Sequence, residues 1–387
     1  MKTLILTSRK HLTLVMLFST TLLGGLESST AANYIWSNAG TDWNSTTSWT
    51  AGTGTPSAGG DVAIFSTTAV TNPNLSASVS ISRITANSST VASYTLSSSN
   101  NAVLTLGSVA TGTSAAINYT PASGSFTIDA PIVLGAAANS TQGVNVNSEN
   151  GTVIINGPIS STNLVTLQKS GTGRLVLSGA NSYSGGTLLS AGTLALSGSG
   201  TLGTGTLTLA STGTLDISAI SGSSYSLTQT FNASGAVNAT GKTLNVASSA
   251  LNVGGTSAVS LFTVAGALSL GSTNVTNLEI TGISSFDQIA VSNLLTLDGS
   301  IVVTSSYTFT LGDSFDLLDW GTLGSSGFSV SSDLLLPTLS NGLSWDTSAF
   351  LTSGTVSVVP EPNIPALMGL GVLLLWGAMR RRQYVSV

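Results

Sequence analysis

The stretch that decides the fold is residues 167–198, LQKSGTGRLVLSGANSYSGGTLLSAGTLALSG. Within it, leucine recurs at every second position of short runs, as at Leu175 and Leu177 and at Leu194 and Leu196. An alternation of this period puts one set of side chains on a single face, which predicts short strands with one buried side. Each run stops at Gly, Ser or Asn, the residues that supply turn conformations.

The same pattern returns along the chain at a regular distance. Gly-Thr-Leu begins at positions 186, 192, 205 and 213, and the comparable strands at Gly192 and Gly213 are 21 residues apart. Repeats of this length favour a solenoid, in which each coil buries its apolar face only against its neighbours. A Greek-key sandwich also has short strands at regular spacing and is the alternative. We favour the all-β parallel β-helix, a β-solenoid.

The composition fits stacked coils. Charged residues make up only 6% of the 387 residues, against about 25% in ordinary globular chains, while 41% are hydrophobic. Stacked coils place equivalent positions ~4.8 Å apart, so like charges would repel whereas Ser, Thr and Asn can form hydrogen-bonded ladders. Cysteine is absent and His11 is the only histidine, which excludes disulfides, thiolate chemistry and, once the leader is removed, a Ser-His-Asp triad.

Residues 167–198 closely resemble the autotransporter-associated β-strand repeat. The positions that match its pattern are Lys169, Gly171, Gly173, Leu175, Leu177, Ser178, Gly179, Asn181, Tyr183, Gly185, Gly186 and Thr187. The resemblance covers one copy and implies a right-handed parallel β-helix on an exported surface protein. An autotransporter itself is not expected, because its C-terminal barrel needs alternating strands of roughly 10 residues and the chain ends in an apolar run followed by arginines.

Residues 1–32 have the layout of a secretory signal peptide. A basic start precedes the apolar run Leu12 to Leu26, and small residues up to Ala32 suit cleavage. The alternative is a retained anchor, but the run is shorter than the roughly 20 residues that a spanning helix needs. We therefore expect a signal helix that is removed after export through the Sec translocon.

The C-terminal residues 360–387 form a second targeting signal. An apolar run, Ala366 to Met379, is expected to form a short transmembrane helix with the arginines after it on the cytoplasmic side. With the Pro-Glu-Pro that precedes it, the arrangement resembles the PEP-CTERM sorting signal of Gram-negative bacteria. The resemblance implies processing by an exosortase-type membrane protease; a plain tail anchor is the alternative. The expected sorting-signal residues are Pro360, Glu361, Pro362, Arg380, Arg381 and Arg382.

Between the two signals we expect three regions: 33–163 with an N-terminal cap and the first coils, 164–273 with the repeat, and 274–359 with the final coils and a C-terminal cap. A separate small β domain is the alternative for 274–359. Trp36, Trp43 and Trp49 lie in the first region. Large aromatics near the end of a solenoid usually cover its open core, which we favour here. A carbohydrate-stacking platform is the other interpretation.

Residues 33–359, the part of the chain between the two signals, contain few indications of a catalytic or binding site. Residues 33–359 hold thirteen acidic and four basic residues, a net charge of −9, so no nucleic-acid partner is expected. The residues show no catalytic constellation and no cofactor site. Asp313, Asp316 and Asp319 could hold Ca²⁺, but their spacing lacks the alternation of a calcium loop, and we favour a structural role for them.

The expected function is that of an exported structural or adhesive protein of the cell surface or exopolysaccharide, held at the inner membrane in transit and then released to the outer envelope or matrix. An extracellular polysaccharide is an expected partner. The alternative is a polysaccharide-active enzyme, a hydrolase or a lyase, on the same scaffold. A groove with two facing carboxylates and a basic residue would favour the enzyme, and a uniform Ser/Thr/Asn face the structural protein.

Overall fold

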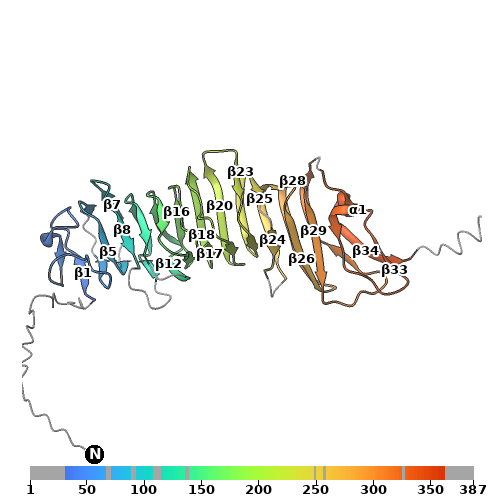
Figure 1. Cartoon of the computed structure of the whole chain (residues 1–387), viewed down its shortest axis with the longest axis horizontal. Helices are drawn as coiled ribbons and strands as arrows, with labels where there is room; N and C mark the ends of the chain where they lie inside the picture. The colour runs from blue at the N-terminus through green and yellow to red at the C-terminus, as the bar shows by residue number, and fades with distance from the viewer. Residues whose placement is uncertain are drawn as a thin grey trace, which may run out of the picture. The chain divides into compact units, whose positions relative to one another are not determined.

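The computed structural model describes residues 31–66, 71–88, 93–107, 115–135, 139–247, 250–255, 259–324 and 327–361. The expected signal helix and the expected C-terminal transmembrane helix lie outside these residues. Within them, the chain is a right-handed parallel β-solenoid of about 11 turns with almost no helix. Figure 1 shows the coils following one another in sequence order along the solenoid, from β1 at one end to β33 and β34 at the other.

Sheet 1 contains 15 strands and runs the length of the solenoid. All its pairs are parallel except β1 with β2 and β26 with β27. In order across the sheet the strands are β2 (Trp49–Thr50), β1 (Asn33–Trp36), β3 (Val62–Phe65), β6 (Arg83–Ala86), β9 (Ala115–Tyr119), β12 (Ser140–Val146), β15 (Val165–Ser170), β17 (Thr187–Leu189), β19 (Leu207–Leu209), β22 (Phe231–Ala233), β24 (Ala250–Val253), β26 (Val275–Gly282), β29 (Ser300–Ser305) and β32 (Leu334–Leu335), with β27 (Ser285–Phe286) beside β26.

Sheet 2 contains 12 strands and forms a second wall. Its strands are β31 (Leu318–Leu323), β28 (Gln288–Thr296), β25 (Leu261–Leu270), β23 (Ala236–Val246), β20 (Gly213–Ile220), β18 (Gly192–Gly198), β16 (Arg174–Leu177), β13 (Asn150–Ile155), β10 (Ser123–Ile128), β7 (Tyr94–Ser98) and β4 (Asn74–Leu75), with β21 (Ser224–Leu227) beside β23.

Two smaller sheets complete the fold. Sheet 3 closes the early coils with β14 (Ile159–Ser161), β11 (Ile132–Leu134), β8 (Leu104–Leu106) and β5 (Val79–Ile81). Sheet 4 is antiparallel and follows the last coils, with β30 (Ser314–Asp316), β34 (Thr355–Pro360) and β33 (Leu343–Asp346).

The register confirms the repeat length read from the sequence. Gly192 of β18 lies opposite Gly213 of β20, so a 21-residue spacing is one turn of the solenoid. Leu194 and Leu196 point inward and are fully buried, as are Leu215 and Ile217 one coil later. Each coil therefore buries its alternating apolar set against the coils on either side, as a solenoid requires.

Some strands are longer than the short strands that the pattern predicts. β23, β25 and β28 span 11, 10 and 9 residues. They run around a corner where the pairing register shifts, and Gly266 in β25 adopts a φ of +144° there. An added Cβ at Gly266 would meet the Ala239 carbonyl oxygen at 2.1 Å, so the close approach of the two coils requires glycine at this position.

The all-β prediction is confirmed, with three short helical turns as exceptions. The described residues include two single helical turns, α1 (Val330–Asp333) and α2 (Phe350–Ser353), and a 3₁₀ turn, η1 (Thr46–Ser48). Segments of four residues are too short to show a 3.6-residue period in the sequence. In the part of the chain that the structure describes, no helix combines the length and apolarity needed to cross a membrane.

Aromatic side chains fill the first coils. Trp36, Trp43 and Trp49 are buried, and the ring centroid of Trp49 lies 5.0 Å from that of Trp36 and 4.8 Å from that of Trp43. The rings continue into the core through Phe65, which packs on Phe126 at 5.1 Å. The carbohydrate platform is wrong, because buried indole faces cannot stack on a sugar, whereas a cap formed by these tryptophans stays a prediction.

Candidate functional site

The lysine of the repeat serves the fold. Lys169 is fully buried, and its Nζ donates to the carbonyl oxygens of Ser170 and Gly171, both at 2.8 Å, and of Ala191 at 3.2 Å. Because Ala191 belongs to the next coil, one amine both closes its own turn and ties two coils together. Burial lowers the pKa of Lys169 to about 8. The amine is occupied by three carbonyls and is not presented to a ligand.

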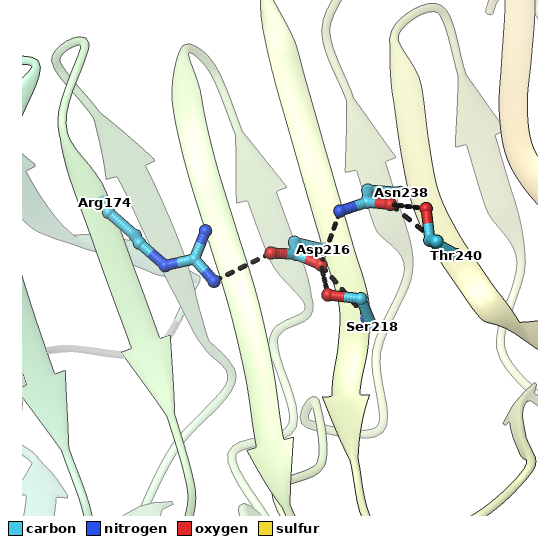
Figure 2. Close-up of polar contacts among 5 residues, drawn as sticks. All are labelled: Arg174, Asp216, Ser218, Asn238 and Thr240. Atoms are coloured by element: carbon cyan, nitrogen blue, oxygen red, sulfur yellow. Dashed lines mark hydrogen bonds and ion pairs between the residues drawn. The ribbon is translucent and has the colours of Figure 1, made fainter.

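A polar network lies on the outer face of sheet 2 (Figure 2). The Nη2 of Arg174 in β16 donates to Oδ2 of Asp216 in β20 at 2.7 Å, reaching across β18. The other carboxylate oxygen accepts the hydroxyl and backbone N–H of Ser218, at 2.7 and 3.0 Å, and Nδ2 of Asn238 at 3.1 Å. Asn238 in turn accepts the Thr240 hydroxyl at 2.7 Å. Arg174 and Asp216 form the one ion pair among the described residues.

The carboxylate of Asp216 is held ionised. Burial raises its pKa, but the hydrogen bonds from Ser218 and Arg174 outweigh burial and leave the pKa below its ordinary value. A general acid needs the opposite, a pKa raised toward neutrality. Asp216 therefore fixes Arg174 and Asn238 in place and does not present a proton.

A groove of about 450 Å³ lies beside this network on the same face. Its outward-facing residues form a row in register across five strands, from β20 to β31. The row is Thr214, Ala236, Thr263, Ala290 and Asp319, and Asn238, Ala265 and Ser292 lie next to it. The short side chains of this region leave the sheet surface hollow, and most of the floor is apolar.

The groove does not contain the carboxylate pair that hydrolysis needs. Asp319 is the only acidic residue in its lining. Asp216 lies four strands away from Asp319, which at ~4.8 Å per strand is roughly 19 Å. The two carboxylates of a glycosidase stand about 5 to 9.5 Å apart. The groove therefore does not have the carboxylate spacing of a glycosidase.

One carboxylate elsewhere has the raised pKa of a possible acid. Burial, with a contribution from Glu279, raises the pKa of Asp287 to about 6, although backbone hydrogen bonds partly oppose the shift. Its two oxygens accept the backbone N–H groups of Ser260 at 2.7 Å and Glu279 at 2.8 Å. Asp287 is buried and lies outside the groove. Its role is to connect the segments at Ser260 and Glu279 at a corner of the solenoid.

The three aspartates that could have held Ca²⁺, Asp313, Asp316 and Asp319, do not form a metal site. Asp313 is buried in a turn, where it accepts the backbone N–H of Thr310 at 2.7 Å and its hydroxyl at 3.0 Å. Asp316 and Asp319 are exposed on β30 and β31, two different sheets. Among the residues that the structure describes, no group of three or more acidic or histidine side chains could hold a metal ion.

Only the start of the expected sorting signal falls within the described residues. Pro360 is the last residue of β34 and Glu361 follows it, both exposed. The backbone N–H of Glu361 donates to the Gly342 carbonyl at 3.0 Å. Pro362 and the arginines Arg380, Arg381 and Arg382 lie outside the described residues.

Sequence reasoning missed Asp216, Asn238 and the groove. The register places Arg174 in line with Thr193 and Thr214, and Asp216 lies two residues beyond Thr214, so the repeat spacing alone does not indicate this ion pair. Nothing in the sequence marks the groove, because its residues are small and come from five strands.

Comparison with known proteins agrees with the repeat. A family model described as the passenger-associated-transport-repeat matches residues 167–196, which confirms the expected autotransporter-associated repeat. These residues form parts of four strands, β15 to β18, in the middle of the solenoid. The rest of the chain lies outside that match, and no curated protein matches the chain.

Proposed function

We propose that the chain is an exported, surface-displayed β-solenoid that acts as a structural or adhesive protein and has no catalytic activity of its own. The observation that carries the proposal is a passenger-type repeat, residues 167–196, built into a continuous solenoid. Repeats of this kind are typical of exported surface proteins. Export would use the Sec translocon and the N-terminal signal at residues 1–32.

The absence of charge from most of the surface supports a display role. Outward positions carry Ser, Thr and Asn, and asparagine side chains join neighbouring coils, as from Asn277 to Asn252 and from Asn252 to Asn232, both at 2.7 Å. A hydrogen-bonded surface of this kind is stable without a ligand and offers few groups for chemistry. The groove on sheet 2, with one carboxylate in its lining, does not favour the alternative of a hydrolase or lyase.

We further propose that the C-terminal segment is a PEP-CTERM signal processed by an exosortase-type protease of a Gram-negative host. The body would be held at the inner membrane in transit and then released to the outer envelope or to exopolysaccharide. The exposure of Pro360 and Glu361, at the end of the last strand, supports the proposal, because a processing protease must reach its site. The helix expected at 366–379 would hold this site at the membrane surface.

Mass spectrometry of the surface-associated protein in its native host tests the proposal. We expect peptides that end near Pro360 to Pro362, and we expect Glu361→Ala to block the cut and retain the protein in the inner membrane. Glu149→Ala, at an exposed turn far in sequence from Glu361, is the matched control and should be processed normally. Mature protein whose peptides run through Pro362 to Arg380 would identify a plain membrane anchor instead.

A further inference from the structure

We infer that the groove on the outer face of sheet 2 binds a neutral, hydroxyl-rich linear glycan. A volume of about 450 Å³ lies within the range of roughly 300 to 1,000 Å³ that ligand sites occupy. Such sites combine a mostly apolar surface with a few placed polar groups. The groove has this character: methyl groups of Ala236, Ala265 and Ala290 form much of its floor, between hydroxyl and carboxylate groups.

The polar groups of the groove have hydrogen-bonding capacity left over. Thr214, Thr263 and Asp319 make no side-chain hydrogen bond to any other described residue, and the Ser292 oxygen accepts the Gly266 N–H at 3.0 Å, which leaves its own O–H to donate. Hydroxyls that donate and accept, next to a carboxylate that accepts, complement the hydroxyls of a sugar. The flat methyl floor complements the C–H faces of sugar rings.

The electrostatics favour a neutral ligand over an acidic one. No cation lines the groove, Arg174 is paired with Asp216, and Nζ of Lys242 donates to the Gly222 carbonyl at 2.8 Å. Asp319 and the net charge of −9 over residues 33–359 would repel a polyanion.

The shape favours a linear chain. The row from Thr214 to Asp319 crosses five strands, so its outward side chains recur every ~4.8 Å along the solenoid axis, close to the length of one pyranose unit. Successive sugars could thus meet successive coils. Because no aromatic ring lines the groove, we expect weak binding per site, strengthened when many displayed copies contact one polymer.

Saturation-transfer NMR of the purified full chain with cellohexaose, mannohexaose and laminarihexaose tests the inference. We expect binding of at least one of these neutral hexasaccharides, which should remain intact. Ala290→Phe fills the groove from a half-exposed outward position and should weaken binding by at least about tenfold. Asp319→Ala, which removes an exposed carboxylate, should weaken it by a smaller factor.

The matched control is Ser125→Phe, which adds the same ring at an outward position of β10 on the same sheet, away from the groove. It should bind like the unmodified chain. Equal weakening by both phenylalanine variants, binding of a basic peptide but no glycan, or no binding to any hexasaccharide would overturn the inference.

This inference rests on the proposed function in one respect: display at the cell surface is what would bring the groove into contact with a glycan. The two fail separately: an Ala290→Phe protein that is displayed normally but has lost glycan binding supports both. A chain that binds glycan in solution but is not displayed would remove the proposed function alone.

Discussion

At the scale of single residues, the repeat motif is explained by contacts between coils. Asn181 accepts the backbone N–H of Ile159 at 2.8 Å and donates to the Thr201 carbonyl at 2.6 Å, so it joins the coils before and after its own. Tyr183 is fully buried, and its hydroxyl pairs with Thr187 at 2.7 Å. Gly171 has a φ of +75°, and a Cβ there would meet the Val146 carbonyl oxygen at 2.3 Å. The motif thus specifies a turn and its connections.

We predict that Lys169→Met destabilises the solenoid by roughly 2–4 kcal/mol, because three buried carbonyls lose their donor. The urea midpoint of unfolding measures the loss. Lys242→Met is the control, since its amine has one carbonyl partner at an exposed position, and it should change the midpoint little.

Measuring the urea midpoint as a function of pH distinguishes the effect of the Lys169 amine from the effect of its buried side-chain carbons. The pKa of Lys169 is about 8 in the fold against 10.5 ordinarily, so the unfolded chain binds more protons between these values and stability should rise from pH 8 toward pH 10. Above pH 10 the trend should reverse, because burial raises the pKa of Tyr119 and Tyr183 to about 12 and the unfolded chain ionises first. A rise from pH 8 to 10 that persists in Lys169→Met would contradict this assignment.

At the scale of strands, side-chain ladders on the outer face hold neighbouring coils in register. On sheet 1, Asn232, Asn252 and Asn277 occupy successive strands β22, β24 and β26 at directly paired positions. The middle amide, Asn252, donates to Asn232 and accepts from Asn277. Asparagine can continue such a ladder over any number of coils, whereas a charged residue would meet its like one strand away.

We predict that Asn252→Ala costs about 1–2 kcal/mol, because it removes two hydrogen bonds and leaves Asn232 and Asn277 without their partner. Thermal unfolding followed by circular dichroism measures the effect. Asn245→Ala removes one bond of 3.2 Å to Ser226 and serves as the comparison. If the two variants lose the same stability, the ladder adds nothing beyond single contacts.

At the scale of the whole molecule, the two ends of the solenoid are covered by different devices. The tryptophan cluster and the antiparallel strand β2 cover the first coil. Sheet 4 and the turns α1 and α2 follow the last coils, where the ring of Trp345 packs on Phe309 at 5.0 Å. Both ends therefore differ from the coils between them, each of which contacts a similar coil on either side.

We predict that Trp43→Ala and Trp345→Ala unfold opposite ends. Loss of the buried Trp43 should cost about 3–5 kcal/mol, and because each coil contacts only its neighbours the damage should stay near the N-terminal coils. Limited proteolysis should then cut Trp43→Ala first before residue 135 and Trp345→Ala first after residue 300. Identical cleavage patterns would mean that the solenoid unfolds as one unit.

The sequence by itself determined the coil. Which residues face inward depends on a period of two, and the turn at each corner depends on Gly, Ser or Asn at fixed offsets, so Leu194, Leu215 and the pairing of Gly192 with Gly213 could be read directly. These are local properties, and stacking of similar coils only repeats them.

The tertiary structure alone decided what the coils place side by side. Whether Trp43 was a cap or a sugar platform depended on its burial by later coils, and the groove depended on small residues of five strands falling in one row. Coil lengths vary: 19 residues separate Arg174 from Thr193, and 21 separate Thr193 from Thr214. Which residues of different coils lie side by side is therefore known only once the register of every coil is known. The candidate site is therefore a property of the stack, set by pairing between strands that no single repeat encodes.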